Sequence, residues 1–132
     1  MRLLVAFILV NFMVFSCNKN NKLDKDLVGK WQLVEQLMDP GDGSGKYVAI
    51  ESEKTLEFKN DGTFTCNGDI CSINGESEFP SSGIFDSEEK TITGTACMTE
   101  SLFDIDYSFK SGKLILAFPC IEACLQKFER IE

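Results

Sequence analysis

The stretch FDIDYSF, residues 103–109, decides the fold of this chain. Its odd-numbered residues are large and apolar, whereas its even-numbered residues are polar. Side chains of a β-strand alternate between two faces, so a period of two predicts a strand with one buried and one wet face. We therefore expect a strand over 103–110 that covers a core with one face only.

The same alternation recurs along the chain, between short runs of Gly, Asn, Asp and Ser. Combined with the β-branched and aromatic residues, it predicts strands at 27–38, 54–60, 63–67, 82–87, 90–96, 103–110, 113–119 and 124–131. An all-β domain is expected.

The connections between these strands alternate in length. Short ones with the Gly and Asx residues of tight hairpins lie at 60–62, 87–89 and 111–112. Longer ones lie at 38–53, 68–81, 97–102 and 119–123. In an up-and-down meander, tight turns then gather at one end, the base, and longer loops at the other, the mouth. The sequence predicts a single eight-stranded up-and-down antiparallel β-barrel.

The last segment has two interpretations. Ile121, Cys124, Leu125 and Phe128 are spaced as on one face of a helix, and Pro119 suits a first helical turn. A strand over 124–131 would instead remove the two unpaired edges that a seven-stranded sheet leaves. We favour the strand for this reason.

The N-terminal residues have the pattern of a secretory signal. Arg2 precedes an apolar run over 3–15 that is too short to span a bilayer as a helix. The run ends in Val14-Phe15-Ser16-Cys17, which resembles the lipobox of bacterial lipoproteins. This resemblance implies a signal peptide over 1–16 and a lipidated Cys17. The alternative is an ordinary secretory peptide with an incidental cysteine.

Cleavage before Cys17 would leave 116 of the 132 residues, enough for one domain with one core. We expect residues 17–26 to be the lipidated cysteine and a flexible tether, and 27–132 to be the barrel. One acylated terminus anchors a protein to a membrane without spanning it. By resemblance to known sorting rules, Asn18 is not the aspartate that retains lipoproteins in the inner membrane. The outer membrane, on its periplasmic side, is therefore expected.

Gly29-Lys30-Trp31 on the first strand and Arg130 on the last resemble a motif pair of lipocalin-like, or calycin, barrels. The resemblance is to the small lipocalin-like lipoproteins of bacteria and covers about residues 27–131. It implies that Arg130 crosses the barrel base and packs on the face of Trp31, a cation–π contact. The alternative is that Trp31 is a core aromatic and Arg130 a surface charge.

Two features depart from the lipocalins proper, which are longer. The predicted strands are short and rich in Phe, which favours an interior filled by the protein's own side chains. In addition, Cys66-Asn67-Gly68 and Thr95-Ala96-Cys97-Met98 resemble, more weakly, the META-type domains of heat-shock-related lipoproteins.

Five cysteines remain if Cys17 is lipidated, and strand parity places all of them at the mouth: Cys66, Cys71, Cys97, Cys120 and Cys124. An exported compartment oxidises thiols, and five is odd, so at least one thiol stays unpaired within a monomer. The first candidate is a Cys120–Cys124 disulfide across a three-residue loop. The alternatives are Cys97 with one of these two or with Cys66, and Cys66 with Cys71.

The chain has no histidine, so the usual activating base of a nucleophilic cysteine is missing. The C-x4-C and C-x3-C spacings do not match zinc knuckles, and no C-x-x-C redox pair occurs. Residues 39–43, DPGDG, lack the register of a calcium loop and predict a flexible lid. Glu35 alternates onto the face of Trp31 and Leu33, where we expect a structural role. We expect no enzyme, no cofactor and no metal.

Without its signal the chain has 12 basic and 21 acidic residues, a net charge of −9. This charge argues against nucleic acid as a partner. Two functions stay open. One is a non-catalytic, lipid-anchored module that binds a small apolar ligand at its mouth. The other is an acidic interaction or inhibitor lipoprotein, with a filled barrel, that binds a basic protein such as lysozyme. An empty interior would favour the first and a packed one the second.

Overall fold

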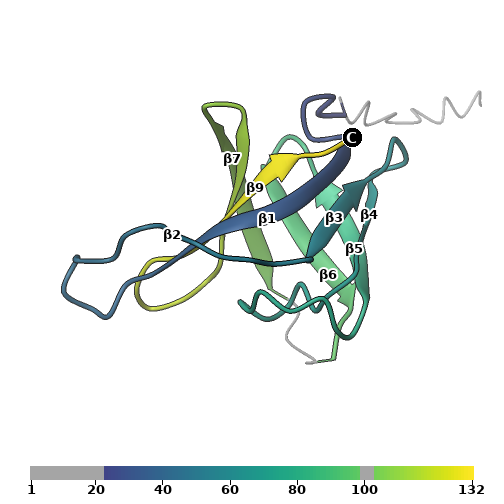
Figure 1. Ribbon diagram of the computed structural model, residues 1–132. Coiled ribbons are helices and arrows are strands. Elements are labelled where there is room, and N and C mark those ends of the chain that lie inside the picture. Colours follow the sequence, from purple (N-terminus) through teal and green to yellow (C-terminus); the bar gives the residue numbers. More distant parts are fainter. Residues whose placement is uncertain (1–22, 99–102) are drawn as a thin grey trace, which may run out of the picture.

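The computed structural model describes residues 23–98 and 103–132, so the predicted signal peptide and Cys17 lie outside the described residues. The described part is all-β, as the alternation predicts, and contains no helix (Figure 1). Its strands are β1 (Gly29–Met38), β2 (Val48–Ala49), β3 (Thr55–Phe58), β4 (Thr63–Cys66), β5 (Ser81–Asp86), β6 (Thr91–Ala96), β7 (Asp104–Lys110), β8 (Lys113–Ala117) and β9 (Cys124–Arg130).

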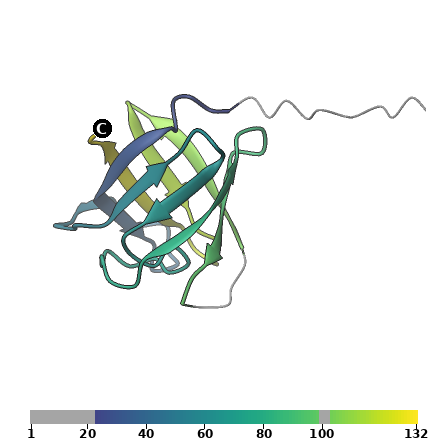
Figure 2. The same ribbon diagram turned by 90° about the vertical axis from the view of Figure 1, so that its right-hand side faces the viewer.

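The strands form one antiparallel sheet that closes on itself. From β3 to β9 each strand pairs with the next, β3 also pairs with β1, and β9 returns to β1. The closing ladder runs from Trp31 opposite Arg130 to Met38 opposite Cys124. The last segment is therefore a strand, and the closed eight-stranded barrel is the predicted one, with one extra strand (Figure 2).

The extra strand, β2, is absent from the sequence prediction. Its two residues pair with Gln36 and Glu35 of β1, on the edge of β1 that pairs with β3 further along. β1 has ten residues and β3 only four, so β1 extends past β3 toward the mouth. A strand of two residues, both exposed, is too short to show a period in the sequence.

A β-bulge in β1 reverses the direction of Glu35. The register with β9 runs from Leu33 opposite Phe128 to Glu35 opposite Lys127, so Val34 is an extra residue. Residues directly opposite each other share a face, and Glu35 therefore lies on the outer face with Lys127. The prediction that Glu35 shares the inner face of Leu33 is wrong because the bulge interrupts the period of two.

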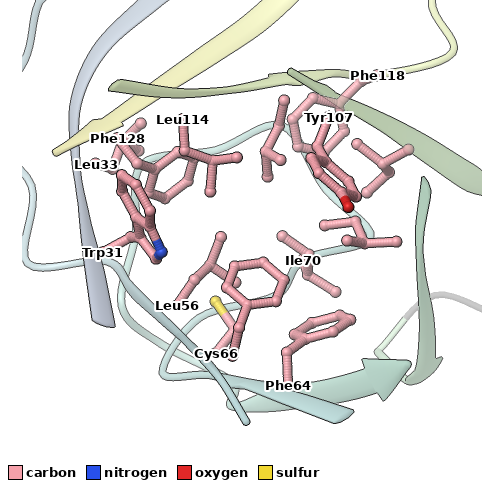
Figure 3. Close-up of a cluster of buried hydrophobic side chains, with 14 of the residues drawn as sticks. Trp31, Leu33, Leu56, Phe64, Cys66, Ile70, Tyr107, Leu114, Phe118 and Phe128 are labelled. Carbon is pink, nitrogen blue, oxygen red and sulfur yellow. The ribbon is translucent and has the colours of Figure 1, made fainter. Parts of the chain in front are cut away.

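The interior of the barrel is filled by apolar side chains. Most strands contribute, and Figure 3 shows these side chains converging from opposite walls. Apart from cysteines, the buried members from the strands are Trp31, Leu33, Leu56, Phe58, Phe64, Ile92, Ile105, Tyr107, Leu114, Leu116 and Phe128, each at most 3% exposed. Burying one such side chain contributes about 1.5–3 kcal/mol, so this core is the main source of stability.

β5 contributes no fully buried large side chain to this core; its Phe85 packs against the core only partly buried, and at Gly83 the Phe64 ring covers the strand. A Cβ on Gly83 would lie 2.6 Å from the Phe64 ring and 2.0 Å from the backbone oxygen of Thr93. Only glycine allows this approach, so Gly83 is the place where the Phe64 ring lies against the backbone of the neighbouring strand.

Candidate functional site

The base of the barrel is closed by Trp31 and Arg130, the two residues of the motif pair. The Arg130 Cζ lies 4.3 Å from the centroid of the Trp31 ring. Its guanidinium donates to the backbone oxygen of Val28 at 2.7 Å and to that of Asp26. The Trp31 indole donates to the backbone oxygen of Leu27 at 2.8 Å. The cation–π contact implied by the resemblance is present, and the backbone before β1 is fastened to it.

Residues 23–26, which the sequence assigns to the tether, are held against this base. The backbone N–H of Asp24 donates to Ser87 Oγ at 2.8 Å. The Asp24 carboxylate pairs with Lys90 and accepts the Tyr107 hydroxyl at 3.2 Å. Burial alone would raise the pKa of Asp24, but the hydrogen bond and charge of Lys90 bring the pKa below its usual value. The packed domain therefore includes these four residues.

The mouth is covered by the β4–β5 connection, residues 67–80, which we call the plug. Ile70 is fully buried, and Figure 3 shows its side chain among those of the core. Ser81 Oγ donates to the backbone oxygen of Gly68 at 2.6 Å and accepts the Ile70 N–H at 2.9 Å. Asn67 Oδ1 accepts the Thr55 N–H at 2.7 Å, which fastens the start of the plug to β3. The longest loop after β3 thus turns inward.

A fully buried lysine, Lys54, holds the middle of the plug. Its ammonium donates to the backbone oxygens of Asp69, Ser72 and Asn74, at 3.1, 3.4 and 2.9 Å. Burial lowers the pKa of Lys54, which the nearby Cys66 and Asp69 partly oppose. An ammonium has three donors, and here each has an acceptor. Lys54 is therefore a structural cation that organises the plug.

Lys54 is not among the residues predicted from the sequence, although its position contains a signal for burial. Lys54, Leu56 and Phe58 share the same parity on and before β3, and all three are buried. A strict period of two would have placed the lysine on the inner face. The residue type argues against that position, because lysine is rarely buried without partners.

The five cysteines lie at the mouth, as strand parity predicts, and four of them form disulfides. The predicted Cys120–Cys124 pair is bonded, with its Cα atoms 5.9 Å apart. The second disulfide joins Cys71 to Cys97, with a Cα separation of 6.0 Å. The alternatives that joined Cys97 to Cys66, Cys120 or Cys124, and Cys66 to Cys71, are wrong, because the plug turns Cys71 inward over β6.

Gly94 of β6 makes room for the second disulfide. A Cβ at this position would lie 2.6 Å from the sulfur of Cys71 and 2.6 Å from that of Cys97. The odd cysteine is Cys66, a free thiol that is 3% exposed and accepts the Gly68 N–H at 3.3 Å. Burial raises the pKa of Cys66, which disfavours the reactive thiolate.

The mouth also contains one group of metal-ligand side chains among the described residues. Asp69, Cys71 and Cys97 place one ligand atom each within 4.8 Å of one another. Both sulfurs belong to the disulfide, however, and a metal requires thiolates. In this oxidised form the group cannot serve as a zinc site.

The connection between β1 and β2 is organised by a single carboxylate. Asp39 accepts backbone N–H groups from Gly41, Gly43 and Gly45, at 2.8, 3.0 and 2.7 Å. The bonds from Gly41 and Gly45 are the main cause of a lowered pKa for Asp39. Because these N–H groups already occupy its oxygens, the residues that superficially suggest a calcium loop form an Asx-type turn.

Hollows lined by described residues lie on the outer surface. One, of roughly 430 Å³, lies between β1 and the segment that follows β2, and is lined by Gln32, Leu33, Val34, Ile50, Glu51, Ser52 and Glu53. A second, of roughly 700 Å³, lies at the base, where residues 23–26 meet the β5–β6 turn. Their linings come from connecting segments and strand edges.

The two ends of the barrel differ in how their charges are paired. Three ion pairs lie at the base: Lys30–Glu132, Lys90–Asp24 and Lys113–Glu129. Near the mouth, four glutamates are exposed and have no ion pair with the described residues: Glu51, Glu53, Glu76 and Glu78. Exposed glutamates without an ion pair also lie at the base, at Glu88 and Glu89, but several exposed lysines share that end, whereas Lys46 is the one exposed lysine in the described mouth connections. The excess of acidic over basic side chains therefore lies toward the mouth.

Exposed apolar side chains are also frequent at the mouth. Eight large hydrophobic residues are exposed in the described chain, and five lie in mouth connections or at the strand ends beside them: Met38, Val48, Phe79, Met98 and Ile121. Phe79 also has a φ of +61°, which is unusual for a residue with a bulky side chain. The mouth thus presents apolar and acidic groups together.

Comparisons with protein-family models, with curated proteins and with solved structures found no match to this chain. Within residues 23–98 and 103–132, no helix has the length and apolar character needed to cross a membrane.

Proposed function

We propose that this protein is a non-catalytic protein-binding module of the bacterial cell envelope, lipid-anchored through Cys17 at the outer membrane, which binds a basic protein. The filled barrel carries the proposal. Pockets for small molecules usually enclose about 300–1,000 Å³. Here side chains such as Trp31, Phe64 and Phe128 take up the interior, and the plug covers the mouth.

The charge distribution supports a basic partner. The mouth connections have many exposed carboxylates and one exposed lysine, whereas the base has three ion pairs and further exposed lysines near its carboxylates. A concentrated negative potential attracts cationic proteins and accelerates their association. On this proposal, the acidic residues attract the partner in addition to keeping an exported domain in solution.

The position of the predicted lipid anchor would leave the mouth accessible to such a partner. The described chain starts at residue 23, beside Ser87 at the base, and only residues 18–22 separate it from Cys17. A lipid on Cys17 would thus turn the base toward the membrane. The mouth would face the periplasm, where a soluble partner has access to it.

Salt-dependent binding tests this function. The mature domain is titrated by calorimetry with a panel of basic proteins, lysozyme among them, and with acidic proteins of similar size. Binding to a basic protein is expected at about 0.01 M salt, weakening by about 0.3 M as charges are screened. If the domain binds no basic protein, or binds basic and acidic proteins alike, the proposal is wrong.

A small apolar ligand at the mouth is the competing function, and the exposed apolar residues there favour it. Native mass spectrometry of the protein purified from its own membrane distinguishes the two. A co-purified apolar molecule would support the ligand-binding function, whereas a clean apoprotein supports the proposal made above.

A further inference from the structure

Two segments that are distant in the sequence meet beside the mouth. Ser52 Oγ donates to the backbone oxygen of Gly75 at 2.5 Å. A Cβ on Gly75 would lie 3.2 Å from the Cδ1 atom of Ile50, so the Ile50 side chain packs closely against the backbone of Gly75. We call the surface formed by residues 48–53 and 75–79 the mouth flank.

The mouth flank has an apolar component. The open hollow of roughly 430 Å³ borders it, with Val34 and Ile50 among its lining residues. Val48 and Phe79, at the two far ends of the flank segments, are 63% and 54% exposed. A hollow of this size accepts one or two apolar side chains, and the Phe79 ring is available for contact.

Phe79 is also held in an unfavourable backbone conformation. A positive φ is costly for an aromatic residue, and residues of this kind are concentrated at binding and switch sites. The ring is not buried in compensation, because it is more than half exposed in this structure. The fold thus presents an aromatic side chain to solvent despite its cost.

The acidic component of the flank has no compensating charge. Its carboxylates belong to Glu51, Glu53, Glu76 and Glu78, and the flank segments contain no lysine or arginine. The adjacent Lys54 is no exception, because its ammonium is buried and bonded to three backbone oxygens. A neutral or acidic partner would leave these carboxylates desolvated and unpaired, which disfavours such complexes.

We propose that the mouth flank is the docking surface and that its occupant is a cationic peptide segment with apolar side chains, belonging to the basic partner. Lysine or arginine side chains of this segment pair with the flank glutamates. An apolar side chain between them enters the hollow beside Ile50, and Phe79 packs on another. This inference rests on the proposed function and adds the surface and the chemistry of the partner.

Three synthetic peptides serve as probes: one of alternating Lys and Leu, one of alternating Lys and Ser, and one of alternating Glu and Leu. The Lys/Leu peptide is expected to bind most tightly to the mature domain, and the Glu/Leu peptide not to bind. Amide chemical-shift changes on titration should concentrate in 48–53 and 75–79. Shifts that concentrate at the base, or equal binding of all three peptides, would overturn the inference.

Two triple variants with the same change of charge locate the site. The flank variant is Glu51→Gln, Glu53→Gln and Glu76→Gln. The control is Glu57→Gln, Glu88→Gln and Glu89→Gln, which removes three exposed carboxylates from the outer face of β3 and the β5–β6 turn. Loss of three surface ion pairs should weaken Lys/Leu binding about tenfold in the flank variant, against less than about twofold in the control.

Phe79→Ala separates the apolar contact from the charges. Its loss of affinity should persist at high salt, whereas the loss caused by the flank glutamates should disappear there. Equal weakening by the flank and control variants would overturn the docking site but leave the proposed function intact, because affinity would then follow net charge alone. The separate titration with basic proteins decides the proposed function itself.

Discussion

The base and the mouth of this barrel satisfy their polar groups in different ways. At the base, each charged group also has a side-chain partner: Arg130 covers Trp31 besides donating to backbone oxygens, and Asp24 binds Lys90. At the mouth, the buried cation Lys54 bonds only to backbone oxygens, and the exposed glutamates have no cationic partner among the described residues. The tight turns at the base are short, and their residues mainly make structural contacts. The longer connections supply both a plug and a surface available to a partner.

The largest expected effect is at the base. Trp31→Ala removes a ring that is 2% exposed and supports Arg130, and should lower the free energy of unfolding by about 3–5 kcal/mol. Phe79→Ala, the matched aromatic at the mouth, should change it by less than about 0.5 kcal/mol. Urea unfolding followed by far-ultraviolet circular dichroism measures both. Equal losses in the free energy of unfolding for the two variants would contradict the distinction between a structural base and a mouth available for contact.

The two disulfides at the mouth are expected to contribute unequally to the free energy of unfolding. Cys71→Ala with Cys97→Ala opens a link of 26 residues, and Cys120→Ala with Cys124→Ala one of four. The chain-entropy model gives losses of about 3.5 and about 2 kcal/mol, respectively. Thermal unfolding of the two double variants should show the lower midpoint for the first. The reverse order would indicate that the plug is not held by its disulfide.

Lys54→Met tests the polar centre of the plug. It leaves the backbone oxygens of Asp69, Ser72 and Asn74 without their buried donor, at an expected cost of about 2 kcal/mol. Amide hydrogen exchange over 67–80 should become faster, and the Cys66 thiol should begin to react with a thiol reagent. The exposed Lys59→Met is the control and should change neither. An unreactive Cys66 in both variants would contradict the role given to Lys54.

The smallest effect expected is the pH dependence of the base. The pKa of Asp24 is lower in the folded protein than in the unfolded chain, so its stabilising contribution is present above about pH 4 and is lost as the pH falls through the folded pKa. Asp24→Asn should cost about 1 kcal/mol at neutral pH. In urea titrations the difference from wild type should shrink as the pH falls below about 4 and the Asp24 carboxyl becomes protonated. A pH-independent difference would mean that charge is not what Asp24 contributes.

The alternating strands and the base contact were predictable because they depend on local patterns. The alternation in FDIDYSF is enough to predict a strand. Gly29, Trp31 and Arg130 lie on strands whose ends at the base can be assigned from the tight turns. Even the odd number of free thiols followed from counting. These features require no knowledge of which distant segments meet.

The plug and the mouth flank were not predictable for the opposite reason. The Cys71–Cys97 bond depends on an inward turn of the plug, and the bulge at Val34 depends on how β9 pairs with β1. The close approach of Ser52 to Gly75 joins residues 23 apart in sequence, without any shared motif. Long-range packing overrides the local period at each of these places.

The ladder that closes the barrel has a consequence for how the chain folds. Trp31 and Arg130 are direct partners although almost the whole domain lies between them. Contacts between residues so far apart in sequence form slowly, because the intervening chain must lose conformational entropy before the contacts stabilise the fold. Until β9 is complete, β1 and β8 each keep an open edge that another chain could join. The pairing of β9 with β1 and β8 therefore protects the protein against self-association while it folds.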